Sequence, residues 1–223
     1  MYAAHHTPPR HFFTDFKHLA RLFYSGRTFV AFDTETTGLH AETDYLIEIG
    51  AVRFDCNGIV GEPFDALIKP PVPISDFLCA LTHIDNHMVA DKPAAAEVLP
   101  QFLRYLQDDS PVLVAHNAPF DLGFVNTELQ RMTFPPLTNL TVDTLPLARW
   151  AYPMLSQEKE KGQYKLQSLA KRFSLEVHAA HRADDDARVC MELFKRILQD
   201  TLPVQKDFQQ AQAAATAMQP LLF

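Results

Sequence analysis

The chain has 223 residues, of which 47% are hydrophobic, so it is long enough for one sizeable domain with its own core. Its net charge of −7 excludes a general nucleic-acid binder with a basic surface, so any contact with a polyanion must be local. The 3 cysteines lack paired spacing, which argues against a disulfide framework or a zinc site. No apolar run approaches the length of a membrane span and no signal-peptide pattern opens the chain, so we expect a cytoplasmic protein with no membrane contact.

Residues 1–26 are expected to form an N-terminal extension with a helix that packs on the main domain. Prolines and polar residues open this segment, and apolar residues then recur at helical spacing over residues 11–25. The residues that carry this spacing are Phe12, Phe13, Phe16, Leu19, Leu22 and Phe23.

Residues 29–39, with the sequence FVAFDTETTGL, are the stretch around which the rest of the chain is organised. Four apolar residues predict a short strand that is buried on both faces. Asp33 and Glu35 follow directly, and residues two positions apart in a strand point to the same side of the sheet. Two neighbouring carboxylates beside an apolar core repel each other, and a hard divalent cation such as Mg²⁺ or Mn²⁺ would relieve that repulsion.

Further elements follow in an order that predicts a mixed α/β domain over residues 27–200. Strands are expected at residues 45–54, 59–68, 111–115 and 140–142, with a hairpin turn at residues 57–58. Helices are expected at residues 94–106, 120–131, 144–151, 165–173 and 184–198. Glu48, inside the second strand, is interpreted as facing outward or as paired locally, and not as a metal ligand. Residues 201–223 are interpreted as a tail that forms a linker or a weak helix outside the core.

Acidic residues recur where predicted elements meet. Asp121 begins a helix after a buried strand. The run from Asp184 to Asp186 opens the last helix, and Asp186 lies five residues after His181. Each acid on its own could be a helix-capping residue, and His181 alone would be an ordinary loop histidine. Together with Asp33 and Glu35, they supply the carboxylates and the base that two-metal hydrolysis of a phosphodiester requires.

The motifs resemble those of the DEDDh family of 3′–5′ exonucleases, the family of the proofreading epsilon subunit of bacterial DNA polymerase III. The matching segments are FVAFDTETTGL with LIEIGAV beyond it, VAHNAPFDLGFV, VDTLPLAR, YKLQSLA and HRADDDARV. They cover residues 27–198 in the order and spacing of the family. The resemblance implies an RNase H-like fold, with a five-stranded mixed sheet flanked by helices.

The resemblance also implies roles for individual residues. Asp33, Glu35, Asp121 and Asp186 would bind two divalent cations, Mg²⁺ or Mn²⁺, and His181 would be the general base, with Glu35 also counted among the catalytic residues. Asp184 and Asp185 do not have the spacing of the motif acid. Substrate contacts are expected from Thr34, Thr36, Leu39, Leu81, Thr82, His116, Asn117 and Phe120. His83 stands where the family often has glycine, so we expect the backbone or the nucleotide pocket to differ there.

The expected function is metal-dependent release of 5′-mononucleotides from single-stranded or frayed DNA 3′ ends, in proofreading or repair. Two alternatives remain open: an RNA-trimming exoribonuclease of the same family, and a non-catalytic adaptor for a polymerase or clamp. The sequence does not reveal the ribose contact that would separate DNA from RNA. Loss of a motif acid would favour the adaptor, and all five motif positions are filled.

The last five residues resemble the peptide with which bacterial proteins bind the sliding clamp. The similarity lies in Gln219, Leu222 and Phe223, whereas Pro220 and Leu221 depart from the common form. A sliding clamp and a DNA polymerase are therefore expected partners, with a frayed tail as the alternative.

Overall fold

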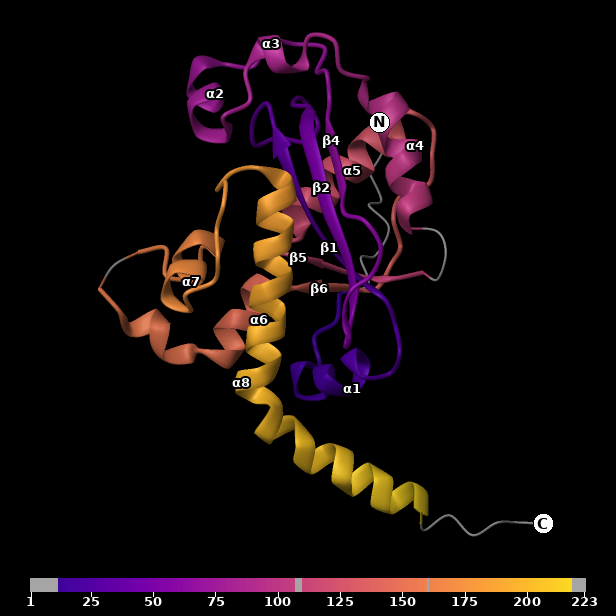
Figure 1. The fold of residues 1–223 in the computed structure, drawn as a ribbon, viewed down its shortest axis with the longest axis vertical. Helices are drawn as coiled ribbons and strands as arrows, with labels where there is room; N and C mark the ends of the chain where they lie inside the picture. The colour runs from indigo at the N-terminus through magenta and orange to yellow at the C-terminus, as the bar shows by residue number, and fades with distance from the viewer. Residues whose placement is uncertain (1–11, 107–109, 160, 218–223) are drawn as a thin grey trace, which may run out of the picture.

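The computed structural model describes residues 12–106, 110–159 and 161–217, with side chains up to residue 203. A mixed β-sheet forms the centre of the molecule and helices cover both of its faces (Figure 1). The prediction of an α/β domain with a mixed sheet flanked by helices is confirmed.

The sheet has the strand order β3-β2-β1-β5-β6, with β4 also paired to β2. Its strands are β1 (Phe29–Thr36), β2 (Leu46–Asp55), β3 (Gly58–Ile59), β4 (Phe64–Leu67), β5 (Val112–Ala115) and β6 (Thr141–Asp143). β1 runs antiparallel to β2 and parallel to β5, which is in turn parallel to β6. The organising strand of the sequence is therefore also the central strand of the sheet.

The sheet contains six strands because the single strand expected at residues 59–68 is divided in two. β3 and β4 both pair antiparallel with β2, at different positions along it. Gly61, with φ 72°, and Pro63 lie between them, and both residues are unfavourable for a continuous strand. β3 and β4 together take the place of the single strand expected at residues 59–68, and this division raises the number of strands from five to six.

The helices are η1 (Phe16–His18), α1 (Leu19–Phe23), α2 (Asp76–Thr82), α3 (Asn86–Val89), α4 (Ala95–Leu106), α5 (Pro119–Arg131), α6 (Thr144–Ala151), η2 (Pro153–Gln157), α7 (Leu166–Arg172) and α8 (Ala183–Ala217).

Two large apolar clusters lie on the two faces of the sheet. In one, Phe29 and Ala31 of β1 pack with α1, α6, α7 and the first half of α8. In the other, Val30 and Phe32 pack with α4 and α5. The alternation along β1 therefore assigns each of its side chains to one helical layer.

The N-terminal helix is shorter than the one expected over residues 11–25. Phe12 and Phe13 are extended, and the Phe13 N–H donates to the carbonyl of Thr141 in β6 at 2.7 Å. The short helices η1 and α1 then place Phe23 against the rings of Phe29 and Phe194 at 5.4 and 5.6 Å. The expected packing of this segment on the domain is present, although the division of the chain at residue 26 stays a prediction.

The C-terminal helix is longer than the one expected at residues 184–198. α8 continues to Ala217, so residues 201–217 of the segment interpreted as a linker or weak helix are a continuation of α8. Figure 1 shows that α8 bends as it leaves the sheet, and Pro203 lies inside the helix. A proline within a helix removes a backbone hydrogen bond and favours a bend. The peptide with Gln219, Leu222 and Phe223 lies outside the described residues.

Within the described residues, none of the helices combines the length and the apolar character needed to cross a membrane.

Gly50 of β2 makes the closest approach between the sheet and α8. A Cβ atom at this position would lie 2.3 Å from the carbonyl carbon of Ala183 and 2.3 Å from the backbone nitrogen of Asp184. Gly50 is also the partner of Asp33 in the β1–β2 register. The absence of a side chain at Gly50 therefore allows the beginning of α8 to lie directly on the strand beside Asp33.

We expect Gly50→Ala to lower the free energy of unfolding by roughly 1–3 kcal/mol, because the added methyl group would displace the α8 backbone. Alanine is intrinsically more favourable than glycine in a strand, so any loss must come from the contact with α8. Urea unfolding of the two proteins measures the difference. An equally stable or more stable variant would contradict the packing described here.

Candidate active site

The end of β1 presents Asp33 and Glu35 on the face of the sheet that α8 covers. Burial alternates here, since Thr34 and Thr36 are buried whereas the two acids are partly exposed. The acids continue the row of Phe29 and Ala31, as their spacing in the strand requires.

Asp121 reaches the same strand end from the other helical layer. It lies in the first turn of α5, directly after β5, and only 2% of its surface is exposed. One of its oxygens accepts hydrogen bonds from the Thr34 N–H at 3.0 Å and the Thr34 hydroxyl at 2.7 Å. Thr34, which we expected to contact substrate, thus connects β1 to Asp121.

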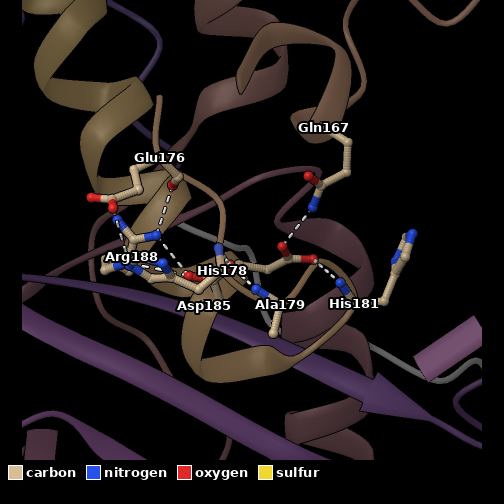
Figure 2. Close-up of polar contacts among 8 residues, drawn as sticks. Gln167, Glu176, His178, Ala179, His181, Asp185 and Arg188 are labelled. Carbon is tan, nitrogen blue, oxygen red and sulfur yellow. Dashed lines mark hydrogen bonds and ion pairs between the residues drawn. The ribbon is translucent and has the colours of Figure 1, made fainter. Parts of the chain in front are cut away.

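The three consecutive aspartates at the start of α8 have different surroundings. Asp184 is exposed. Asp185 is buried and accepts hydrogen bonds from the preceding loop, which lower its pKa against the effect of burial. Asp186 accepts a hydrogen bond from Gln167 Nε2 at 2.6 Å and another from the His181 N–H at 3.2 Å (Figure 2). Asp186 therefore has partners that Asp184 and Asp185 lack, and its role as the motif acid stays a prediction.

Glu35, His181 and Asp186 converge on one point. One carboxylate oxygen of each acid and one ring nitrogen of His181 lie within 4.8 Å of one another. Besides burial, the neighbouring carboxylates of Asp121, Asp186 and Glu35 raise the pKa of Asp33, so these four acids lie close enough to repel one another. The structure thus brings together all five residues that the sequence placed at the reacting centre.

Glu48 is buried, and the expectation that it faces outward was wrong. Its carboxylate forms an ion pair with Arg182, with a shortest contact of 2.5 Å, and accepts the Ala183 N–H at 2.8 Å. It lies opposite Glu35 in the β1–β2 register, and its partner Arg182 is not local but far along the chain. The sequence did contain a signal for a buried, paired carboxylate here, because Glu48 is an acid within an otherwise apolar strand.

The pKa values of the clustered carboxyl groups are raised. Burial, reinforced by neighbouring carboxylates, raises the pKa of Glu35 to about 8 and that of Asp33 well above its ordinary value. Burial also raises the pKa of Asp121 to about 7 and that of Asp186 to about 6, although hydrogen bonds from Thr34 and Gln167 oppose the shift. In the part of the chain that the structure describes, no lysine or arginine forms an ion pair with these four acids.

The donor set fits divalent cations. Carboxylate oxygens are hard ligands, and a cation between them would remove the repulsion that raises their pKa values. Asp33, Glu35, Asp121 and Asp186 are the residues that would hold it.

His116 and Asn117 follow β5 and line a cavity of about 450 Å³ together with Arg149, Tyr164 and Lys165. The Nε2 of His116 lies 2.8 Å from the Tyr164 carbonyl and its Nδ1 lies 2.8 Å from the Thr144 hydroxyl. Burial lowers the pKa of His116 to about 4, so the ring is neutral at pH 7 and its single proton is on Nε2, facing the carbonyl. His116 therefore fixes the wall of this cavity with both ring nitrogens.

The other residues expected to contact substrate differ in accessibility. Leu39 is 77% exposed and Leu81 is 39% exposed, so both side chains are accessible to a ligand. Phe120 is partly buried and packs on Phe124. Thr36 and Thr82 are buried, and their hydroxyl groups donate to backbone carbonyls.

Arg131 holds the loop between β1 and β2, which carries Leu39, through hydrogen bonds to its backbone. The sequence did not reveal this role. The Arg131 guanidinium donates to the carbonyls of Ala41, Glu42 and Asp44 at 2.9–3.2 Å. Arg131 lies on α5, the helix that also carries Asp121. No sequence pattern distinguishes this arginine, or Gln167, from a surface residue.

His83 ends α2 with φ 58° and ψ 21°, in the left-handed region that favours glycine. The backbone therefore has a conformation that glycine adopts without strain, and His83 adds a side chain to it. A difference in the nucleotide pocket at this position stays a prediction.

Known proteins resemble this chain over most of its length. The family model described as Exonuclease matches residues 30–194. DNA polymerase III subunit epsilon of Treponema pallidum is 48% identical over 170 residues, which cover 76% of this chain and 76% of that protein. The PolC-type DNA polymerase III of Caldanaerobacter subterraneus is 41% identical over 171 residues, and the match spans only 12% of that much longer protein.

Solved structures show the same fold. Exonuclease X in complex with 5′ overhanging duplex DNA matches with a TM-score of 0.58 and 30% identity, over 77% of this chain and 91% of that one. Exonuclease I matches with a TM-score of 0.72 and 20% identity, over 82% of this chain and 43% of that one. The second likeness supports the fold alone.

We expect the metal-free protein to lose stability as the pH rises from about 4.5 to about 8. A carboxyl group whose pKa is higher in the folded than in the unfolded state, as for Glu35, binds more protons when folded, so the free energy of unfolding falls across that interval. Added Mg²⁺ should raise the melting temperature more at pH 8 than at pH 5, by about 2–4 °C for each kcal/mol.

Asp33→Asn tests the same repulsion. In chelator at pH 8 the variant should melt above the wild type, and Mg²⁺ should no longer stabilise it. Asp184→Asn, which makes the same charge change at an exposed position, should leave both properties unchanged. Wild-type stability that increases with pH in chelator would contradict the electrostatic account.

Proposed function

The chain belongs to the exonuclease family, and from this premise we propose that it removes 5′-mononucleotides from DNA 3′ ends in a metal-dependent reaction, in proofreading or repair. The observation that carries the proposal is the convergence of Asp33, Glu35, Asp121 and Asp186 around His181, from β1, α5 and α8.

Asp33, Glu35, Asp121 and Asp186 would hold two divalent cations, Mg²⁺ or Mn²⁺. When bound, such ions lower the pKa of water and stabilise the charge on the attacking and leaving oxygens. The raised pKa values of these acids support this assignment, because bound cations would stabilise the ionised carboxylates that burial and mutual repulsion disfavour.

His181 would act as the general base. Histidine takes up protons near neutral pH, and its ring lies beside Glu35 and Asp186. It accepts a proton from the attacking water while the water oxygen bonds to the terminal phosphorus. The bond from phosphorus to the 3′ oxygen of the preceding nucleotide breaks, that oxygen takes up a proton, and a nucleoside 5′-monophosphate leaves.

The DNA end would lie along the apolar side chains near these acids. Leu39 is exposed on the loop whose carbonyls Arg131 binds, and Leu81 is exposed on α2, so both are available to pack against the terminal base. Exonuclease X, which is 30% identical to this chain, was solved in complex with 5′ overhanging duplex DNA, and this supports DNA as the substrate. RNA trimming remains the alternative within the same family, and the intact set of acids speaks against a non-catalytic adaptor.

We expect Asp186→Ala to lower the rate of mononucleotide release by at least about 10³-fold, because a ligand of the cations is lost. Asp184→Ala should stay within about twofold of the wild type. The assay follows 5′-labelled single-stranded DNA, a mispaired 3′ end and an RNA strand of the same sequence, with the products identified by chromatography. Degradation that persists in chelator or in Asp186→Ala would remove the nuclease assignment, and faster loss of RNA would favour the alternative.

Gln219, Leu222 and Phe223 are proposed to bind a sliding clamp. Burial of the two apolar side chains would contribute roughly 1.5–3 kcal/mol each, which after ordering costs gives an affinity of about 1 µM at best. We expect a bacterial clamp to bind the whole chain and to lose binding when the chain ends at Met218, with unchanged activity on free oligonucleotides. Equal binding by both proteins, or binding by neither, would remove this partner.

A further inference from the structure

The loop between α7 and α8, residues 173–182, carries His181 and is held by a pair of residues that the reaction does not use. Asp185 and Arg188 lie on the first turns of α8, and both face back toward this loop (Figure 2). Asp186 has other partners, since it accepts hydrogen bonds from Gln167 Nε2 and from the His181 N–H.

Asp185 binds the loop through its backbone. One carboxylate oxygen accepts the N–H groups of His178 and Ala179 at 2.8 and 2.9 Å. The other oxygen accepts the Nε and Nη2 groups of Arg188 at 3.2 and 2.7 Å. The Asp185 side chain is 4% exposed, so these contacts are shielded from water.

Arg188 extends the same network to the beginning of the loop. Its Nη2 also donates to the Glu176 carbonyl at 2.7 Å. The pair therefore fixes three backbone positions, at residues 176, 178 and 179, to the helix that carries Asp186.

His181 needs this support because its own backbone is strained. Its φ is 62°, in the left-handed region, which is unfavourable for a residue with a Cβ atom. On its other side, Arg182 and the Ala183 N–H are held by Glu48. A short stretch of chain that contains His181 thus lies between two buried carboxylates, and Figure 2 shows the imidazole projecting away from the Asp185 contacts.

We propose that Asp185 and Arg188 are positioning residues for the reaction, which hold the loop so that the His181 ring stays beside Glu35 and Asp186. The proposal rests on the proposed function, since it assigns a role to the support of the general base. Asp185 is not one of the acids that would hold the cations, and it accepts hydrogen bonds from the loop backbone and from Arg188.

The test is a double-mutant cycle between Asp185→Asn and His181→Ala, assayed on single-stranded DNA with saturating Mg²⁺. Asp185→Asn replaces an acceptor oxygen by an amide that cannot accept all of its present donors. We expect kcat to fall about 10–100-fold with KM within about twofold, because displacement of a reacting group by about 1 Å has an effect of this size. Asp184→Asn, the matched control at the preceding exposed position, should retain wild-type kcat.

In the His181→Ala background, Asp185→Asn should lower the rate by no more than about twofold, because a residue that acts through His181 has no further effect once the imidazole is gone. Arg188→Gln is the milder second variant, since it leaves Asp185 bound to the loop backbone. Lys195→Gln is its control, because it also removes the cation of an ion pair between residues three apart on α8, in this case with Glu192. Arg188→Gln should also lower kcat and lose its effect without His181, whereas Lys195→Gln should leave kcat unchanged.

Additive effects of Asp185→Asn and His181→Ala, with KM and melting temperature altered together, would overturn the positioning role. Unchanged kcat in both Asp185→Asn and Arg188→Gln would also overturn it. These results leave the proposed function intact, because wild-type activity and its loss in His181→Ala are measured in the same cycle. An inactive wild type, or a fully active His181→Ala, would instead overturn the proposed function.

Discussion

Repulsion among buried carboxylates is the constraint on which the rest of the structure depends. Four acids meet at the end of the central strand, and burial raises the pKa of each, to about 8 for Glu35 and about 7 for Asp121. Arg182 lies close by, yet it pairs with Glu48 and not with these acids. The fold thus concentrates negative charge that it does not neutralise, an arrangement that is stable only when protons or cations occupy the site.

The remainder of the domain holds these acids against their repulsion. The alternation along β1 directs Asp33 and Glu35 toward α8. Thr34, between them, points to the opposite face of the sheet, where its hydroxyl donates a hydrogen bond to Asp121. Gly50 allows α8 to approach the sheet closely enough for Asp186 to complete the group. Each of these contacts links two elements that are distant in sequence, so the site forms only when the whole sheet and both helical layers are assembled.

The sequence predicted the central acids because their positions follow from local rules. A strand period of two places Asp33 and Glu35 on one face, and each of the other motif residues lies at a boundary between elements. Glu48 was assigned wrongly because its partner, Arg182, lies far along the chain. Gln167 and Arg131 were missed because nothing around them in sequence differs from a surface helix. The split of the strand expected at residues 59–68 was missed because it depends on the positive φ of Gly61, which the sequence does not show. The extension of α8 was missed because the residues beyond Pro203 show little apolar periodicity.

The central claim is that protons on the clustered carboxyl groups exchange with divalent cations. Calorimetric titration of the protein with Mn²⁺ at pH 7, in buffers of different ionisation enthalpy, measures the protons released on binding. The account predicts that at least about one proton leaves per protein molecule, because the pKa values of Glu35 and Asp121 place protons in the site at this pH. It also predicts that fewer protons leave at pH 9, where these groups are already ionised. Binding at pH 7 without proton release would contradict it.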